Sequence, residues 1–165
     1  MITITKIFHY EMAHALHRYD GACANIHGHS YRLEVTVTGA VITDTNHPKC
    51  GMIMDFGDLK QIVQTTVLDE FDHALVLNSE IKKTTLARTC SPCQTDGMDV
   101  DASALLGTGS RTSGFGNVIF VDYQPTNENL LVDFAERIAS ALPSGVSLLR
   151  LRMYETNSSF AEWIP

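Results

Sequence analysis

Positive charge is scarce in this sequence, which has 12 lysines and arginines against 19 aspartates and glutamates and a net charge of −7. Nucleic acids and anionic membranes both require a basic surface, and the chain also lacks an apolar run long enough to span a bilayer. We therefore expect neither a nucleic acid nor a membrane as its main partner. A phosphorylated ligand would need a local basic pocket, because the acidic surface repels it at long range.

Cysteine is also sparse. Four cysteines in 165 residues do not amount to a disulfide framework, so we expect a reducing, cytoplasmic location. Residues 1–6 lack the basic region and the longer apolar core of a secretory signal. With 44% hydrophobic residues, the chain is expected to form a single domain over residues 1–165.

Hydrophobic periodicity predicts an α+β fold, with an antiparallel sheet and helices on one face. Residues 79–117 show poor periodicity, which indicates a long loop with a short helix at about residues 102–106. Thr126 is expected to cap a helix that Pro143 stops. In chain order, we expect strands at about residues 3–10 and 27–39, a helix ending near residue 68, a strand at 118–123, the helix after Thr126, and a strand at 147–155.

Histidines recur at a spacing that suits a metal ion. His27 and His29 are two residues apart at the start of an alternating strand, so both side chains point to the same face. His14, upstream, could supply a third imidazole. Three histidines without a fourth protein ligand are typical of a catalytic zinc site, which keeps one position open. The alternative is that these are ordinary solvated or core-capping histidines.

Cys23 lies four residues before His27. The charge of a zinc ion nearby would favour the nucleophilic, basic thiolate. The same thiolate could instead be a fourth ligand, which would close the site and make it structural. We favour a free Cys23, because three histidines already satisfy a catalytic site.

Asp72 and His73 pair a carboxylate with an imidazole just past the first helix. A carboxylate fixes the tautomer of an imidazole, which suits a proton relay. Adjacent side chains seldom bond to each other, so a local role at the helix end is an equal alternative.

Glu155 ends the last strand on the same parity as Leu149, Leu151 and Met153. A carboxylate on the core-facing side needs a partner. A heterocyclic ligand with two N–H donors would satisfy it, but from local sequence alone an internal arginine such as Arg32 is the preferred partner.

Cys90 and Cys93 form a single C-x-x-C motif within the long loop. A second zinc site would need two more ligands, and a redox role would need a strand-to-helix setting that is absent here. We expect an ordinary loop.

Together these motifs resemble the 6-pyruvoyl-tetrahydropterin synthase superfamily. Within it, the three residues between Cys23 and His27 resemble the 6-carboxy-5,6,7,8-tetrahydropterin synthase branch, which acts in queuosine biosynthesis. The long loop and the pair Met52 and Met54 depart from the pattern. The matching pieces are Ala13-His14, Cys23-x-x-x-His27-Gly28-His29, residues 51–56, Asp72-His73, Pro125-Thr126-x-Glu128-Asn129 and Glu155-Thr156.

The resemblance implies a tunnelling fold, with a four-stranded antiparallel sheet and two helices in each subunit. Three subunits would close a barrel, and two trimers would stack into a homohexamer with active sites between subunits. It also implies a role for each site residue. His14, His27 and His29 would hold Zn²⁺, Cys23 would be the general base, Asp72 and His73 would relay protons, and Glu155 with Thr126 would anchor the pterin.

The implied reaction is that of a zinc-dependent lyase. It would convert 7,8-dihydroneopterin triphosphate to 6-carboxy-5,6,7,8-tetrahydropterin and release acetaldehyde and triphosphate. The alternatives are the 6-pyruvoyl-tetrahydropterin synthase reaction and a zinc- or pterin-binding module without turnover. No cation for the triphosphate stands out among Arg18, Lys82, Lys83, Arg150 and Arg152.

Overall fold

Two long strands of alternating residues form the centre of the fold. The structure is a computed structural model that describes residues 1–81 and 116–165. Strands β1 (Thr3–Ala15) and β2 (His27–Gly39) pair antiparallel over twelve aligned positions, from Thr3 opposite Thr38 to His14 opposite His27. Because side chains alternate between the two faces of a strand, the register sets His14, His27 and the core residues on one face.

Four further strands extend this pair to a sheet in the order β4-β3-β1-β2-β5-β6. On one side of the pair, β5 (Val146–Tyr154) and β6 (Phe160–Trp163) continue the antiparallel pattern. On the other side, β3 (Ala74–Asn78) is parallel to β1, and β4 (Val118–Val121) is parallel to β3.

The prediction of a four-stranded, wholly antiparallel sheet is therefore wrong, whereas the α+β class is confirmed. The two strands that sequence periodicity did not predict are β3 and β6. All five residues of β3 are buried, so this strand has no alternation of polar and apolar residues to detect. Strand β6 has only four residues, which is too short for a period to stand out.

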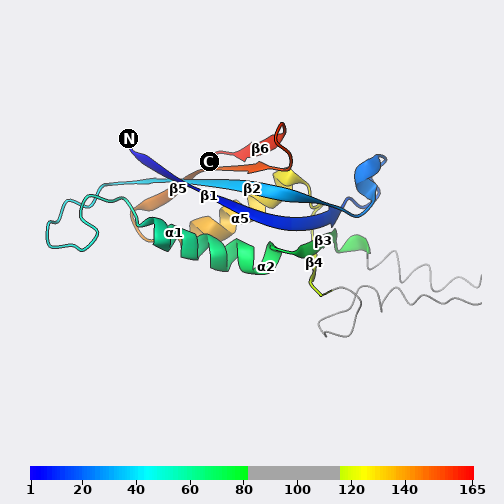
Figure 1. The fold of residues 1–165 in the computed structure, drawn as a ribbon, viewed down its shortest axis with the longest axis horizontal. Coiled ribbons are helices and arrows are strands. Elements are labelled where there is room, and N and C mark those ends of the chain that lie inside the picture. The colour runs from blue at the N-terminus through cyan, green and yellow to red at the C-terminus, as the bar shows by residue number, and fades with distance from the viewer. Residues whose placement is uncertain (82–115) are drawn as a thin grey trace, which may run out of the picture.

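Both main helices cover the same face of β1 and β2 (Figure 1). Helix α1 (Phe56–Val63), a π-helical turn (Gln64–Leu68) and α2 (Asp69–Phe71) follow one another without a break. Helix α5 (Asn127–Ala141) begins at Thr126, whose side chain accepts a hydrogen bond from the Asn129 N–H, as expected for its cap. None of the helices within the described residues is long and apolar enough to cross a lipid bilayer.

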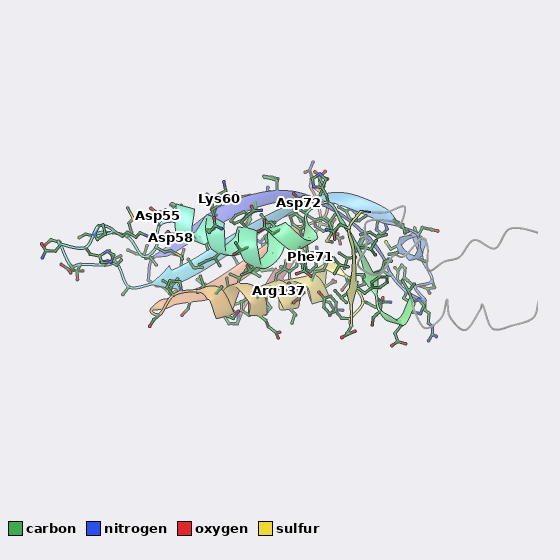
Figure 2. All side chains as sticks on the ribbon, turned by 90° about the horizontal axis from the view of Figure 1, so that it is seen from below. Asp55, Asp58, Lys60, Phe71, Asp72 and Arg137 are labelled. Carbon is green, nitrogen blue, oxygen red and sulfur yellow. The ribbon has the colours of Figure 1, made fainter. Side chains whose placement is uncertain are left out.

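The hydrophobic core lies between these helices and the sheet. The rings of Phe71 and Phe134 meet edge to face, with centroids 4.8 Å apart, and the Arg137 guanidinium lies over the Phe71 ring. Figure 2 labels Phe71 and Arg137 on the two neighbouring helical segments. The opposite face of β1 and β2 has no helical cover in the described residues, and Ile7 on that face is 51% exposed. Buried side chains from the central strands and both helices include Phe8, Tyr10, Leu33, Val35, Leu59, Val63, Leu130 and Ile138.

The expected alternation of Leu149, Leu151 and Met153 in the last strand is wrong at one position. Leu148 is buried in place of Leu149, while Leu151 and Met153 are buried as expected. The pairing of β2 with β5 has an irregularity between Thr36 and Val37. A bulge adds one residue to one strand, so the alternation reverses across it.

Asp55 caps the first helix, and its loss gives a testable change in stability. Its side chain accepts a hydrogen bond from the Gly57 N–H at 2.5 Å. We expect Asp55→Ala to lower the free energy of unfolding by about 1 kcal/mol, because a backbone donor of the first turn loses its partner. Urea denaturation measures this change. Asp55→Asn keeps an acceptor at the cap and should stay close to the parent; equal losses for both variants would contradict the capping role.

The Cys90 and Cys93 pair and the short helix expected at residues 102–106 lie outside the described residues, as do Lys82 and Lys83.

Candidate metal centre and the cavity beside it

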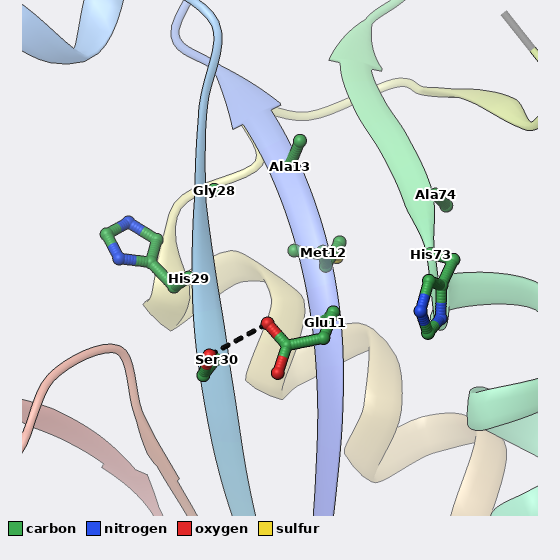
Figure 3. A pocket seen from close by; sticks show the side chains of 8 residues that line it. All are labelled: Glu11, Met12, Ala13, Gly28, His29, Ser30, His73 and Ala74. Atoms are coloured by element: carbon green, nitrogen blue, oxygen red, sulfur yellow. Dashed lines mark hydrogen bonds between the residues drawn. The ribbon is translucent and has the colours of Figure 1, made fainter.

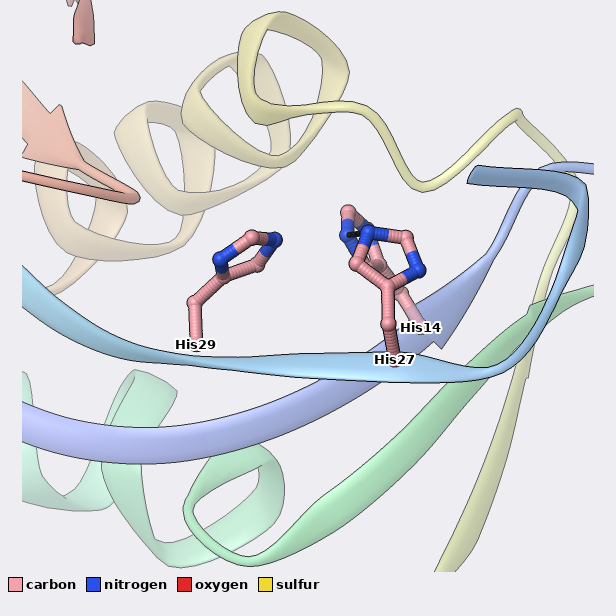
Figure 4. A group of neighbouring side chains, drawn as sticks. All are labelled: His14, His27 and His29. Carbon is pink, nitrogen blue, oxygen red and sulfur yellow. Dashed lines mark hydrogen bonds between the residues drawn. The ribbon is translucent and has the colours of Figure 1, made fainter. Parts of the chain in front are cut away.

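Three histidines converge at the end of the β1–β2 pair (Figure 4). His14 lies on β1 directly opposite His27 on β2, and His29 lies opposite Met12. One ring nitrogen from each histidine falls within a group whose members all lie within 4.8 Å of one another. Among the described residues, this is the one place where three possible metal ligands meet. The strand register therefore brings together the three imidazoles that the sequence analysis selected.

The hydrogen bonds of the outer ring nitrogens orient two of these rings. His14 Nδ1 lies 2.6 Å from the carbonyl oxygen of Pro125, and His27 Nδ1 lies 2.9 Å from that of Asn25. A carbonyl oxygen only accepts, so both Nδ1 atoms carry the proton and, in a neutral ring, Nε2 has the lone pair. This pattern of an imidazole held from behind by a backbone carbonyl is typical of metal-bound histidine.

The two inner nitrogens then face each other. His14 Nε2 and His27 Nε2 are 3.1 Å apart. Burial lowers the pKa of His14, and the neighbouring His27 and His29 lower it further, against the opposing effect of the hydrogen bond to Pro125. Protonation of His14 Nε2, which would let it donate a hydrogen bond to the lone pair of His27 Nε2, is therefore unfavourable. A cation between the rings satisfies both lone pairs, so these residues fit a metal that takes three imidazole ligands, as zinc does.

A cavity of about 300 Å³ opens beside the three histidines. Its lining combines the end of the β1–β2 pair with the start of α5 and the turn after β5. Six of the eight site residues selected from the sequence line it: His14, Cys23, His27, His29, Thr126 and Glu155.

Cys23 reaches this cavity from a short 3-10 turn (Ala22–Ala24) in the loop between β1 and β2. It is a half-buried free thiol. Its sulfur is not part of the group of close ligand atoms that the three histidines form. The thiol thus shares the cavity with the histidines without joining their nitrogen cluster.

Glu155 lines the same cavity just after the end of β5. Within residues 1–81 and 116–165, its carboxylate has no hydrogen-bond or ion-pair partner, and only its backbone N–H is bonded, to Ser159. Arg32, the partner that local sequence favoured, instead pairs with Glu34 at 2.5 Å and lies over the ring of Tyr154. That expected pairing is wrong, and the carboxylate is left as an acceptor facing the cavity.

Asp72 and His73 do not line this cavity. His73 lines a second one, of about 360 Å³, together with Glu11 and Ser30 (Figure 3). Glu11 and Ser30 alternate along their strands with Met12 and His29, so their side chains point to the other face of the sheet. The His73 side chain is 77% exposed there. Within one chain, the described structure does not bring Cys23 and His73 into one pocket.

Asp72 and His73 lie close together. Asp72 Oδ1 is 2.9 Å from His73 Nδ1, an ion-pair distance when the imidazole is protonated, but the two side chains form no hydrogen bond within the described residues. His73 adopts φ +60°, a conformation that is uncommon outside glycine and is found preferentially at functional sites. The carboxylate accepts the Glu11 N–H, and His73 N–H donates to the Glu11 carbonyl. The hydrogen bonds of the pair are therefore local ones to β1, and the proton relay stays a prediction.

Two residues of the cavity region were missed by the sequence analysis. Asn127 lines the cavity, and its Nδ2 donates to the Met153 carbonyl, while its buried Oδ1 has no hydrogen-bond partner among the described residues. The buried Tyr31 hydroxyl also has no partner in that part of the chain, and burial, followed by Glu155 and Cys23, raises its pKa, so it stays protonated. Tyr31 lies two residues after His29 and so shares its face of the strand, a signal that could have identified it. Asn127 looks like any other first-turn residue of a helix, so its sequence context gives no such signal.

Comparisons with known proteins relate almost the whole chain to one family. A family model described as 6-pyruvoyl tetrahydropterin synthase matches residues 3–164. A 6-carboxy-5,6,7,8-tetrahydropterin synthase of Haemophilus influenzae is 31% identical over 164 residues, which cover 99% of each chain.

Solved structures show the same fold. An uncharacterised protein of Wolinella succinogenes superimposes with a TM-score of 0.71 at 21% identity, over 99% of this chain and 97% of that one. The 6-pyruvoyl tetrahydropterin synthase of Caenorhabditis elegans gives a TM-score of 0.59 at 22% identity, over 99% and 95%.

Proposed function

The chain belongs to the 6-pyruvoyl tetrahydropterin synthase family, and from this premise we propose that it is a zinc-dependent 6-carboxy-5,6,7,8-tetrahydropterin synthase. Its substrates would be 7,8-dihydroneopterin triphosphate and water, and its products 6-carboxy-5,6,7,8-tetrahydropterin, acetaldehyde and triphosphate. The observation that carries the proposal is the cavity in which three converging imidazoles, a thiol and a carboxylate without a partner in the described residues meet. The full-length relative of Haemophilus influenzae bears the name of this activity.

In the proposed mechanism, the pterin is anchored by Glu155. Its carboxylate, which has no partner among the described residues, can accept two N–H donors from the 2-amino group and the ring of the heterocycle. Thr126, which lines the cavity beside it, would assist. Zinc held by His14, His27 and His29 would supply Lewis acidity to the hydroxyl groups of the substrate side chain.

Two protein groups would then move protons. Cys23, next to the histidines, would remove a proton from the substrate side chain as the general base. His73, held by Asp72 at 2.9 Å, would shuttle a second proton. Loss of triphosphate and cleavage of a carbon–carbon bond would follow, with uptake of one water molecule and release of acetaldehyde.

The position of His73 supports a role for a second subunit in this mechanism. Cys23 and His73 line different cavities of one chain, which have only His29 in common, and the His73 side chain is exposed on the sheet face that the described helices do not cover. We propose that active sites form between subunits, with three chains closing a barrel and two trimers making a homohexamer. In the cell, the protein would then act in the cytoplasm as an enzyme of queuosine biosynthesis.

The sister reaction, 6-pyruvoyl-tetrahydropterin synthesis, is the second candidate because the matching family model carries its name. Both reactions eliminate triphosphate, but only the first releases acetaldehyde. Product analysis by mass therefore separates them.

Removal of the metal tests the proposal directly. We expect the metal-replete protein to convert 7,8-dihydroneopterin triphosphate, the chelated protein to lose this activity, and added zinc to restore it, because the three histidines are the ligands of one ion. Mass spectrometry of the products and an acetaldehyde assay measure the outcome. A 6-pyruvoyl product without acetaldehyde would identify the sister enzyme. Absence of turnover by the zinc-loaded protein would contradict both enzymes and support a zinc- or pterin-binding module.

A further inference from the structure

The loop that carries Cys23 has little hydrogen bonding to the rest of the fold. Residues 16–26 connect β1 to β2, and most of their hydrogen bonds stay inside the loop. Leu16 N–H donates to the Cys23 carbonyl at 2.9 Å, which closes the loop at its base. Ala24 and Asn25 donate to residues three positions earlier, forming the 3-10 turn.

Gln124 attaches this loop to another part of the molecule. Its Oε1 accepts the His17 N–H at 3.0 Å, and its Nε2 donates to the His17 carbonyl at 2.5 Å. The side-chain amide thus pairs with both backbone groups of one residue, as a neighbouring strand would. Within the described part of the chain, no other hydrogen bond joins residues 16–26 to a segment beyond the adjoining strands.

The two hydrogen bonds from Gln124 lie next to a strained residue of the loop. Arg18, the next residue, adopts φ +59°, a conformation that costs energy for a residue with a side chain. Such a conformation persists only when its surroundings hold it in place. The two bonds at His17 fix the backbone immediately before this residue, one position after the Leu16–Cys23 closure.

Gln124 is itself held firmly. Its backbone carbonyl accepts hydrogen bonds from the Thr126 N–H at 2.7 Å and from Asn129 Nδ2 at 3.0 Å. The next residue, Pro125, provides the carbonyl that orients His14. One short segment before α5 therefore contacts both a metal-binding histidine and the loop that presents the thiol.

We propose that Gln124 is a positioning residue for Cys23, which sets the thiol against the metal centre by clamping His17. The inference rests on the proposed function for the role of the thiol, but the clamp itself can be observed without turnover. A thiol displaced by about 1 Å loses much of its effect, since displacements of that size cost up to ~100-fold in rate.

The test compares Gln124→Ala with Gln61→Ala, an exposed glutamine on α1 that serves as the matched control. In Gln124→Ala we expect faster hydrogen exchange in residues 16–24 and faster alkylation of Cys23 by iodoacetamide. We also expect kcat to fall ~10- to 100-fold with KM changed less than about threefold. Zinc content and the midpoint of thermal unfolding should stay close to the parent, because no ligand and no core side chain is removed. Gln61→Ala should match the parent in every measurement.

Gln124→Glu refines the test. It keeps the acceptor for the His17 N–H and replaces the donor by an oxygen that faces the His17 carbonyl, so it should loosen the loop as Gln124→Ala does. Unchanged exchange and alkylation in both variants would overturn the proposal, and so would a fall in kcat that merely follows zinc loss. If the parent protein fails to turn over the pterin triphosphate, the proposed function fails, while exchange and alkylation still decide whether Gln124 clamps the loop.

Discussion

Replacing Cys23 with alanine is expected to lower kcat ~100- to 10,000-fold, the range that a positioned general base contributes. The thiol lines the cavity beside His14, His27 and His29, yet its sulfur lies outside their cluster of ligand atoms. The variant should therefore still bind one metal ion per chain. Steady-state kinetics at saturating substrate and elemental analysis of the purified protein measure the two effects separately.

Cys50→Ala is the matched control, because Cys50 is an exposed free thiol that lines neither cavity of the site. It should retain both activity and metal. Loss of the metal in Cys23→Ala would instead make the thiol a fourth ligand and the centre structural, and near-normal turnover would remove Cys23 from the proton transfer.

The convergence of the three histidines was predictable from sequence because strand geometry is regular. Residues two apart share a face, so His27 and His29 had to point together once the strand was recognised. His14 was harder, because the expected first strand ended near residue 10. The actual strand runs to Ala15, and its register sets His14 directly opposite His27.

The surroundings of the site were less predictable because they depend on contacts between distant segments. Arg32 was the expected partner of Glu155, but the register of β2 and β5 sets Arg32 opposite Tyr154, where it lies over that ring and pairs with Glu34. The left-handed backbone of His73, next to Asp72, is likewise not revealed by spacing in the sequence. Strand β3 was not predicted either, because all five of its residues are buried and its sequence shows no alternation of polar and apolar residues.

His73→Ala should lower kcat as far as Cys23→Ala does, ~100- to 10,000-fold, if the imidazole relays a proton. The structure adds a sharper expectation for mixtures of the two variants. The cavities that contain Cys23 and His73 are separate within one chain, and the His73 side chain is exposed. If each active site combines Cys23 of one subunit with His73 of another, hybrid assemblies regain some sites in which both residues are intact.

The recovery has an expected size. In an equal, randomly assembled mixture, half of the chains keep Cys23 and the other half keep His73, so about one quarter of the interfaces pair two intact residues. Mixing Cys23→Ala with His73→Ala should therefore restore roughly a quarter of the parent kcat. A mixture of Cys23→Ala with the double variant Cys23→Ala/His73→Ala has no complete interface and should stay inactive. If native mass spectrometry shows that chains have exchanged and activity does not rise above that of the separate variants, the two residues act within a single subunit and the shared-site proposal is wrong.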